Sequence, residues 1–174
     1  MRPAIALIGM RGSGKTTVGL RLARRLGVPF EDTDARAEAA LGLPIADLFA
    51  LGRLAEFRAL EADEVRTALE SPPVVVATGG GAVEDPATRE ALSRAFAAWL
   101  ACPPETLAAR VQGSGRPPLT KLPLVEELRS VLAMRAGFYA TCARMVVDTS
   151  LLSPDEVCDA IEHAWRRLPD HDVR

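Results

Sequence analysis

The segment Gly9-Met-Arg-Gly-Ser-Gly-Lys-Thr16 restricts the fold of this chain more than any other feature. It matches the pattern G-x-x-x-x-G-K-[ST] and stands between an apolar run at 4–9 and a segment with helical apolar spacing at 15–26. A strand, a glycine-rich turn and a helix in this order form a loop whose backbone N–H groups surround a phosphate. The positive end of the helix strengthens that field, so the motif predicts a nucleotide site.

Two side chains of this phosphate loop (residues 9–16) carry specific chemistry. Lys15 supplies a positive charge for the β- and γ-phosphates, and the Thr16 hydroxyl is suited to Mg²⁺. The alternative is a glycine-rich turn with a chance lysine, but the flanking strand and helix favour nucleotide binding. The motif alone does not separate kinases from ATPases or GTPases.

The rest of the chain alternates short apolar runs with longer amphipathic segments. This alternation predicts an α/β fold in which a five-stranded parallel sheet is covered by helices on both faces, with ligands at the carboxyl ends of the strands. Ser153 and Glu156 predict a capping box at the start of the last helix. Strands are expected at 4–9, 28–34, 74–78, 95–102 and 144–149, and helices at 15–26, 44–51, 53–70, after Pro86, from Pro103 and from Ser153.

Length and composition limit the class of protein. The chain has 174 residues, of which 48% are hydrophobic and 25% charged, as expected for one globular domain over 1–174. A net charge of −2 does not suit a nucleic-acid-binding surface, and no apolar stretch is long enough to span a membrane. Three cysteines without a C-x-x-C pair indicate reduced thiols, so a cytoplasmic protein is expected.

The third expected strand ends where nucleotide-binding proteins often place a metal-binding carboxylate. Here the residues are Gly79, Gly80 and Gly81, whereas the second expected strand ends in Asp32-Thr33-Asp34. Strand alternation would direct both aspartates to the same side, so one could act near a metal and the other near a substrate hydroxyl. A helix cap is the alternative use of such an aspartate.

Five charged positions are ambiguous when read alone. Arg58 and Glu61 are three residues apart on an expected helix, where the default is a solvated surface ion pair. Arg135 reads as a surface helix arginine, and Arg110 is similar, although it could reach a nucleotide. Arg116 lies in the glycine- and proline-rich segment 113–123, where an arginine on a mobile loop can neutralise a transferring phosphoryl group.

Together, the phosphate loop, "DTD", "FRALE", "GGG", "RPPL" and "MRAGFY", in this order, resemble the shikimate kinase family over nearly the whole chain. The resemblance implies a nucleoside-monophosphate-kinase-like fold, a three-layer α-β-α sandwich with strand order 2-3-1-4-5. It also implies a mobile lid within about residues 110–123.

The resemblance further implies a role for each residue that matches a family motif. Lys15, Asp34 and Arg116 would be catalytic, and Glu61 would orient Arg58. Shikimate would be bound by Asp34, Arg58, Gly79, Gly80, Gly81 and Arg135. ATP would be bound by Gly12, Ser13, Gly14, Lys15, Thr16, Thr17, Arg110 and Arg116, and Mg²⁺ by Thr16 and, through water, by Asp32.

The implied reaction transfers the γ-phosphate of ATP to the 3-hydroxyl of shikimate, giving shikimate 3-phosphate and ADP on the route to aromatic amino acids. A monomer is expected, with shikimate and ATP as ligands and neither nucleic acid nor membrane as partner. The alternatives are another small-molecule kinase, such as a gluconate kinase, and a shikimate-sensing domain without turnover. Leu151 and Leu152 stand where many relatives carry a basic residue beside the adenine.

Overall fold

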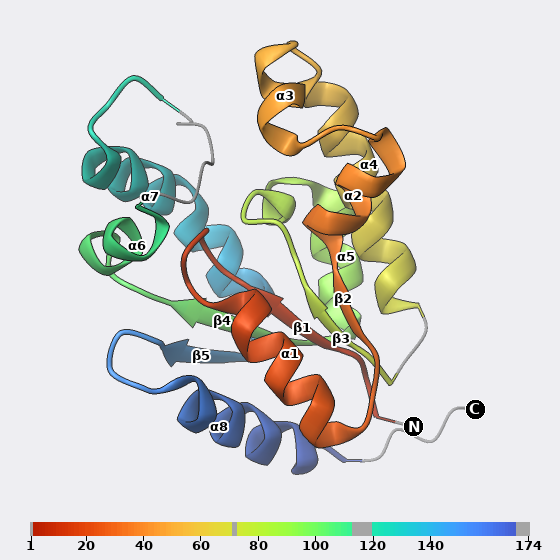
Figure 1. Cartoon of the computed structure of the whole chain (residues 1–174). Coiled ribbons are helices and arrows are strands. Elements are labelled where there is room, and N and C mark those ends of the chain that lie inside the picture. Colours follow the sequence, from red (N-terminus) through yellow and green to blue (C-terminus); the bar gives the residue numbers. More distant parts are fainter. Residues whose placement is uncertain (1, 71–72, 113–119, 170–174) are drawn as a thin grey trace.

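Five parallel strands form one sheet at the centre of the molecule (Figure 1). The computed structural model describes residues 2–70, 73–112 and 120–169. The strand order β2-β3-β1-β4-β5 is the order that the family resemblance implied, and that prediction is confirmed. The strands are β1 (Ile5–Ile8), β2 (Phe30–Asp32), β3 (Val75–Ala77), β4 (Phe96–Ala101) and β5 (Met145–Asp148).

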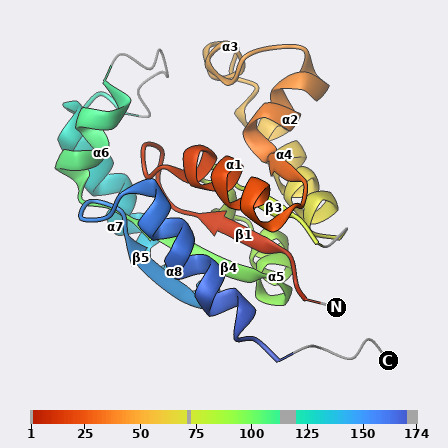
Figure 2. The same ribbon diagram turned by 60° about the horizontal axis from the view of Figure 1, so that its bottom comes forward.

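Helices cover both faces of the sheet, as the alternation of segments predicted (Figure 2). Ile5 and Leu7 of β1 pack into a core with α1 and α8, whereas Ala6 and Ile8 face the opposite core. One face carries α1 (Lys15–Leu26) and α8 (Pro154–Arg166), and the other carries α4 (Leu54–Leu69), α5 (Pro86–Arg94), α6 (Pro104–Val111) and α7 (Leu124–Cys142).

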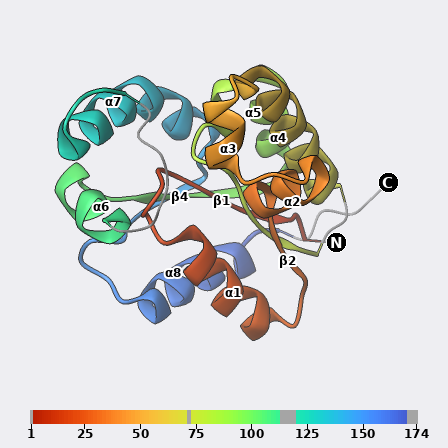
Figure 3. The same ribbon diagram turned by 45° about the horizontal axis from the view of Figure 1, so that its top comes forward.

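Two further helices lie beyond the carboxyl end of β2. They are α2 (Thr33–Leu41) and α3 (Ile45–Ala50), which pack on α4 through Ala37, Leu48 and Phe57. Figure 3 shows this group on one side of the carboxyl edge of the sheet, with α6 and α7 on the other. A short 3₁₀ helix, η1 (Ala82–Glu84), follows β3 at the same edge.

The predicted helix at 15–26 and the capping box of Ser153 and Glu156 are both confirmed. The expected strand at 28–34 is wrong by two residues at each end, because β2 spans only Phe30–Asp32 and α2 begins at Thr33. Asp32 causes this change by accepting hydrogen bonds from the backbone N–H groups of Asp34 and Ala35. An N-cap of this kind starts a helix directly after the strand.

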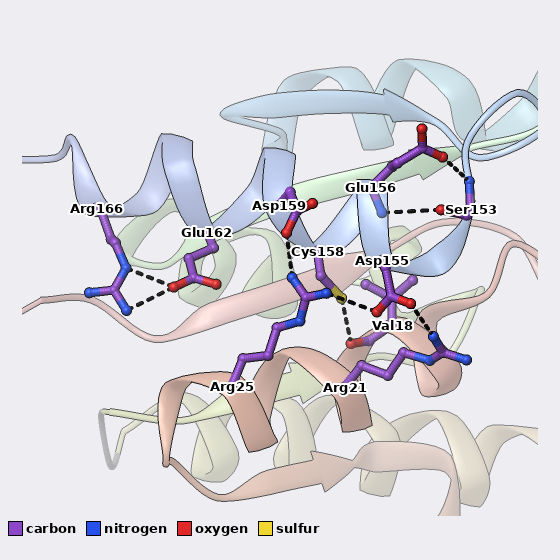
Figure 4. Close-up of polar contacts among 10 residues, drawn as sticks. All are labelled: Val18, Arg21, Arg25, Ser153, Asp155, Glu156, Cys158, Asp159, Glu162 and Arg166. Carbon is purple, nitrogen blue, oxygen red and sulfur yellow. Dashed lines mark hydrogen bonds and ion pairs between the residues drawn. The ribbon is translucent and has the colours of Figure 1, made fainter.

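The exposed sides of α1 and α8 are joined by ion pairs (Figure 4). Arg25 contacts Asp155 at 2.8 Å and Asp159 at 2.5 Å, and Arg21 contacts Asp155 at 2.7 Å. Because these side chains are solvated, each pair contributes little, and the buried apolar face between the helices holds them together. None of the helices in the described residues is long and apolar enough to cross a membrane.

Two glycines allow a test of packing on opposite faces. An added Cβ at Gly19 of α1 would collide with the Phe30 ring and lie 3.2 Å from Leu7 Cδ1, whereas Gly137 of α7 has no atom within 4 Å of that position. We expect Gly19→Ala to lower the free energy of unfolding by about 1–3 kcal/mol through overpacking. Gly137→Ala should raise it by about 0.5–1 kcal/mol through helix propensity.

Urea denaturation of both variants and the parent protein measures these changes. A stabilised Gly19→Ala protein would show that the contact between α1 and β2 is looser than the structure indicates.

Candidate active site

The phosphate loop has the backbone conformation that its glycines permit. Gly9, Gly12 and Gly14 have φ angles of 141°, 81° and 96°, values that residues with a side chain rarely adopt. Gly14 is the N-cap of α1, so the positive end of this helix points into the loop. Lys15 Nζ donates to the carbonyl oxygens of Gly9 at 2.8 Å and Met10 at 2.9 Å, which holds the ammonium group at the loop.

A cleft of about 480 Å³ opens over the phosphate loop. It brings together the residues that the sequence assigned to nucleotide and metal, apart from Arg116, and it includes Asp34 from the substrate group. Arg116 and residues 113–119 of the expected lid lie outside the described residues. The lining residues include Arg11, Gly12, Ser13, Gly14, Lys15, Thr16, Thr17, Asp32, Asp34, Arg110, Thr149, Leu152 and Pro154.

Thr16 and Asp32 offer oxygen atoms beside one another. Thr16 Oγ1 donates to Asp32 Oδ2 at 2.9 Å, while Asp32 Oδ1 caps α2. The two uses that the sequence allowed for Asp32, metal neighbour and helix cap, are therefore compatible. Among the described residues, no group of three or more His, Cys, Asp or Glu could hold a metal. The donor set instead suits Mg²⁺, which keeps several waters and binds nucleotide phosphates.

Arg58 and Glu61 form a partly buried ion pair rather than the solvated surface pair expected by default. Arg58 Nη1 donates to Glu61 Oε2 at 2.6 Å, and the Glu61 side chain is only 2% exposed. Burial raises the pKa of Glu61 above its ordinary value of 4.5, and the charge of Arg58 opposes part of that rise. The Glu61 carboxylate therefore fixes the position of the Arg58 guanidinium.

Two residues of the glycine triplet after β3 must be glycine, because neighbouring side chains fill the space that a Cβ atom would occupy. An added Cβ at Gly79 would overlap the Glu61 carboxylate and lie 2.5 Å from Asp34 Oδ1, and one at Gly81 would lie 2.6 Å from Arg58 Cζ. Neither glycine has a positive φ, so the requirement is steric. The sequence had assigned this space to the ligand alone, whereas two of the three glycines make room for the protein's own charged groups.

Gly80 differs from its two neighbours. An added Cβ there would lie 3.4 Å from Arg11 N, 3.5 Å from Gly9 O and 3.7 Å from Arg135 Nη1, which are ordinary contact distances. The packing of the protein around Gly80 therefore leaves room for a methyl group.

Hydrogen bonds fix the backbone of the triplet and leave two donors. Gly79 N donates to Thr33 Oγ1 at 3.2 Å, and Tyr139 Oη donates to Gly80 O at 2.6 Å. Within the described part of the chain, the N–H groups of Gly80 and Gly81 have no hydrogen-bond partner, so both remain for a ligand. Gly79 has no donor left for a ligand, because its N–H binds Thr33, and Glu61 and Asp34 occupy the space beside it.

Tyr139 is a site residue that sequence reasoning missed. It is completely buried and stacks on Trp99 with ring centroids 5.4 Å apart, and burial raises the pKa of its hydroxyl. The available signal was its position four residues after Arg135 in "MRAGFY", which places both side chains on one face of α7.

Two arginines depart from a surface role in different ways. Arg135 is only 7% exposed, and its Nε donates to Glu84 Oε1 at 2.6 Å. Arg110, in the last turn of α6, donates to Thr149 O at 2.7 Å and to Thr149 Oγ1 at 3.1 Å. These bonds hold Arg110 beside the nucleotide cleft at the end of β5.

The phosphate loop is also tied to α7. Glu127 is completely buried, and it accepts a hydrogen bond from Arg11 of the phosphate loop and one of 2.6 Å from the backbone N–H of Thr120. A buried carboxylate is stable only when it is paired in this way. The pair fixes the first turn of α7 against the phosphate loop.

This sheet order, with a phosphate loop after the central strand and a carboxylate at the end of β2, defines a phosphate-loop kinase of the nucleoside-monophosphate-kinase type. The family model for shikimate kinase matches residues 11–166. The chain belongs to the shikimate kinase family.

Individual relatives agree with this family. A shikimate kinase of Symbiobacterium thermophilum is 45% identical over 168 residues, covering 94% of this chain and 97% of the relative. One of Mycobacterium avium is 40% identical over 174 residues, covering 99% and 97%. The solved structure of the Acinetobacter baumannii shikimate kinase in complex with shikimate is 29% identical, with a TM-score of 0.89 and 97% of each chain covered.

The buried Glu61 makes folding stability depend on pH. Because its pKa in the folded protein is raised, its protonated form is favoured by folding, and stability is lost as the pH rises from about 4.5 through the folded pKa. Glu61→Gln does not titrate. We therefore expect the free energy of unfolding of the parent, minus that of the variant, to fall as the pH increases through this window.

Glu56→Gln on the same helix is the matched control. A hydrogen bond from Arg53 lowers the pKa of the exposed Glu56, so the corresponding difference should rise with pH below about 4.5 and stay constant above it. Urea titrations between about pH 3 and pH 8 measure both differences. A difference for Glu61→Gln that is independent of pH would contradict the assigned burial effect.

Proposed function

We propose that this protein is an ATP-dependent kinase that transfers the γ-phosphate of ATP to the 3-hydroxyl of shikimate, giving shikimate 3-phosphate and ADP. The observation that carries this proposal is the position of Asp34. It lines the nucleotide cleft and also lies against Gly79, next to Glu61, which binds Arg58. A carboxylate is thus placed where a phosphate donor and a small hydroxy acid would meet.

Arg58 and Arg135 form the carboxylate clamp of the proposed substrate site. Guanidinium groups suit this role because their donors match the planar geometry of a carboxylate. Arg58 is held by Glu61 next to Gly81, and Arg135 lies near Gly80. The N–H groups of Gly80 and Gly81 supply two more donors. These groups fix the ring acid so that one hydroxyl points to Asp34.

The nucleotide is held by residues 12–17, with Arg110 beside the cleft. Lys15 stabilises the charge that develops on the transferring phosphoryl group. Thr16 and, through water, Asp32 would hold Mg²⁺, which when bound neutralises charge on the β- and γ-phosphates. Arg116 is proposed as a further cation on the phosphoryl group after closure of a lid within 110–123.

Asp34 accepts a hydrogen bond from the attacking hydroxyl and takes its proton as the bond to phosphorus forms. Asp34, Arg58 and Lys15 belong to three different elements, so the fold must bring them together before the reaction. Leu152 lines the cleft and Leu151 is exposed, so the adenine side lacks a charged contact from these two positions.

We further propose that residues 1–174 act as one domain and as a monomer in the cytoplasm. The three cysteines, Cys102, Cys142 and Cys158, are buried free thiols, which suits a reducing compartment.

The proposed activity is tested by ADP release with a panel of acceptors: shikimate, quinate, gluconate and AMP. Turnover should be strongest with shikimate. Turnover with gluconate or AMP but not with shikimate would transfer the assignment to another small-molecule kinase. Shikimate binding without turnover would favour the sensing domain.

Asp34→Asn tests the role of the carboxylate. The amide preserves the shape of the side chain but cannot take a proton. General acid–base catalysis contributes roughly 10²–10⁴-fold, and we expect a loss in kcat near the lower end because phosphoryl transfer has a loose transition state. Single-turnover transfer at saturating ATP, with shikimate binding measured in parallel, checks this. Unchanged transfer and unchanged binding would remove Asp34 from the site.

Gly80→Ala tests the proposed backbone contact with the substrate. Because the protein leaves room for a methyl group at Gly80, we expect an unchanged melting temperature. The KM for shikimate should nevertheless rise by roughly 10–200-fold, the usual effect of one misplaced methyl group in a binding pocket.

Gly81→Ala is the informative comparison, because its Cβ would displace the Arg58 guanidinium and should affect stability as well as KM. Normal shikimate kinetics in Gly80→Ala would place the substrate elsewhere.

A further inference from the structure

Each arginine of the proposed clamp is held by a carboxylate of the same chain, but in a different way. Glu61 binds a terminal nitrogen of Arg58, whereas Glu84 binds Nε of Arg135. The terminal Nη1 of Arg135 makes a long contact of 4.0 Å with Met10 Sδ. Glu61 is 2% exposed, and the Glu84 side chain is 43% exposed. Glu84 is therefore solvated on one side while it fixes an arginine that is almost completely buried.

The turn that carries Glu84 is itself held firmly. Arg89 Nη1 donates to the carbonyl oxygens of Val83 and Glu84, at 2.8 Å each. The guanidinium of Arg89 also lies over the ring of Phe138 on α7, with its Cζ 4.6 Å from the ring centroid. The backbone of η1 is thus fixed to both α5 and α7.

Three contacts consequently join the segment 79–89 to one side of α7. Tyr139 binds Gly80 O, Phe138 meets Arg89, and Arg135 binds the Glu84 side chain. The first two locate the backbone of the turn. The third fixes a long flexible side chain at Nε, so that Nη1 lies near Gly80, 3.7 Å from the position of an added Cβ.

We propose that Glu84 is a positioning residue that orders Arg135 for the substrate carboxylate and thereby sets the affinity for anionic substrates. The inference rests on the proposed function, because it takes Arg135 as part of the clamp. Glu84 orders Arg135 through its Oε1 atom, which accepts the hydrogen bond from Arg135 Nε. The charge of Glu84 opposes an incoming carboxylate, because Glu84 pairs with Arg135 and adds to the negative charges of Glu61 and Asp34 nearby.

This division between acceptor and charge predicts opposite results for two substitutions. Glu84→Ala removes the acceptor, so Arg135 must be ordered by the substrate, and KM for shikimate should rise by roughly 3–10-fold. Glu84→Gln keeps an oxygen that can accept from Nε and removes the charge, so KM should stay at the parent value or fall. Neither substitution should change kcat or KM for ATP. Glu84→Ala should lower the melting temperature, because the nearly buried Arg135 loses a partner, whereas Glu84→Gln should lower it less.

The experiment measures kcat and both KM values for the parent, Glu84→Ala, Glu84→Gln, Arg135→Ala and the double variant Arg135→Ala with Glu84→Ala. Glu90→Ala on α5 is the matched control, because this exposed carboxylate pairs only with Arg94 among the described residues. If Glu84 acts through Arg135, its removal should not raise KM for shikimate further once Arg135 is absent.

The outcomes separate this inference from the proposed function. No turnover of shikimate by the parent, or an unchanged KM in Arg135→Ala, would contradict the proposed site. A raised KM in Arg135→Ala with a normal KM in Glu84→Ala would overturn the role of Glu84 alone. So would a Glu84→Gln protein as weak as Glu84→Ala, or a Glu84→Ala protein that loses melting temperature and ATP affinity together.

Discussion

The Asp32 carboxylate links the two halves of this site, and the rest of the arrangement depends on it. One oxygen accepts from the Thr16 hydroxyl at the start of α1, and the other caps α2. The cap ends β2 and turns the chain into a helix, which places Asp34 in the first helical turn, beside Gly79. The Asp32 side chain therefore joins the cleft over the phosphate loop to the proposed substrate pocket, which contains Asp34.

Charged groups fill the space around the glycine triplet, and their pairing explains the local sequence. Glu61 and Asp34 occupy the space that a side chain at Gly79 would need, and the Arg58 guanidinium occupies that at Gly81. The space beside Gly80 is not filled by the protein. The buried carboxylate of Glu61 is tolerated because Arg58 binds it. The pKa of Glu61 is still raised, because Arg58 offsets only part of the effect of burial. The same pairing orients the arginine, so stability and ligand recognition depend on the same contacts.

The features that could be predicted from the sequence are those with a local cause. The phosphate loop, the helix at 15–26 and the capping box at Ser153 follow from short patterns of glycine, lysine, serine and glutamate, and all are found in the structure. The start of α2 was missed because "DTD" fits a strand end and a helix cap equally well. The partners Tyr139 and Glu84 were missed because contacts between α7 and the turn after β3 depend on tertiary packing, which no local pattern reports.

Helix α7 carries Glu127, Arg135 and Tyr139 at intervals that are multiples of four residues, and each reaches a different part of the site. Insertion or deletion of one residue between Glu127 and Arg135 would rotate one end of the helix by about 100° relative to the other. The contact with the phosphate loop and the contacts with the triplet could then not be made together. The length of this helical segment is thus constrained as strictly as any single residue, and in this family it should tolerate substitutions far better than changes in length.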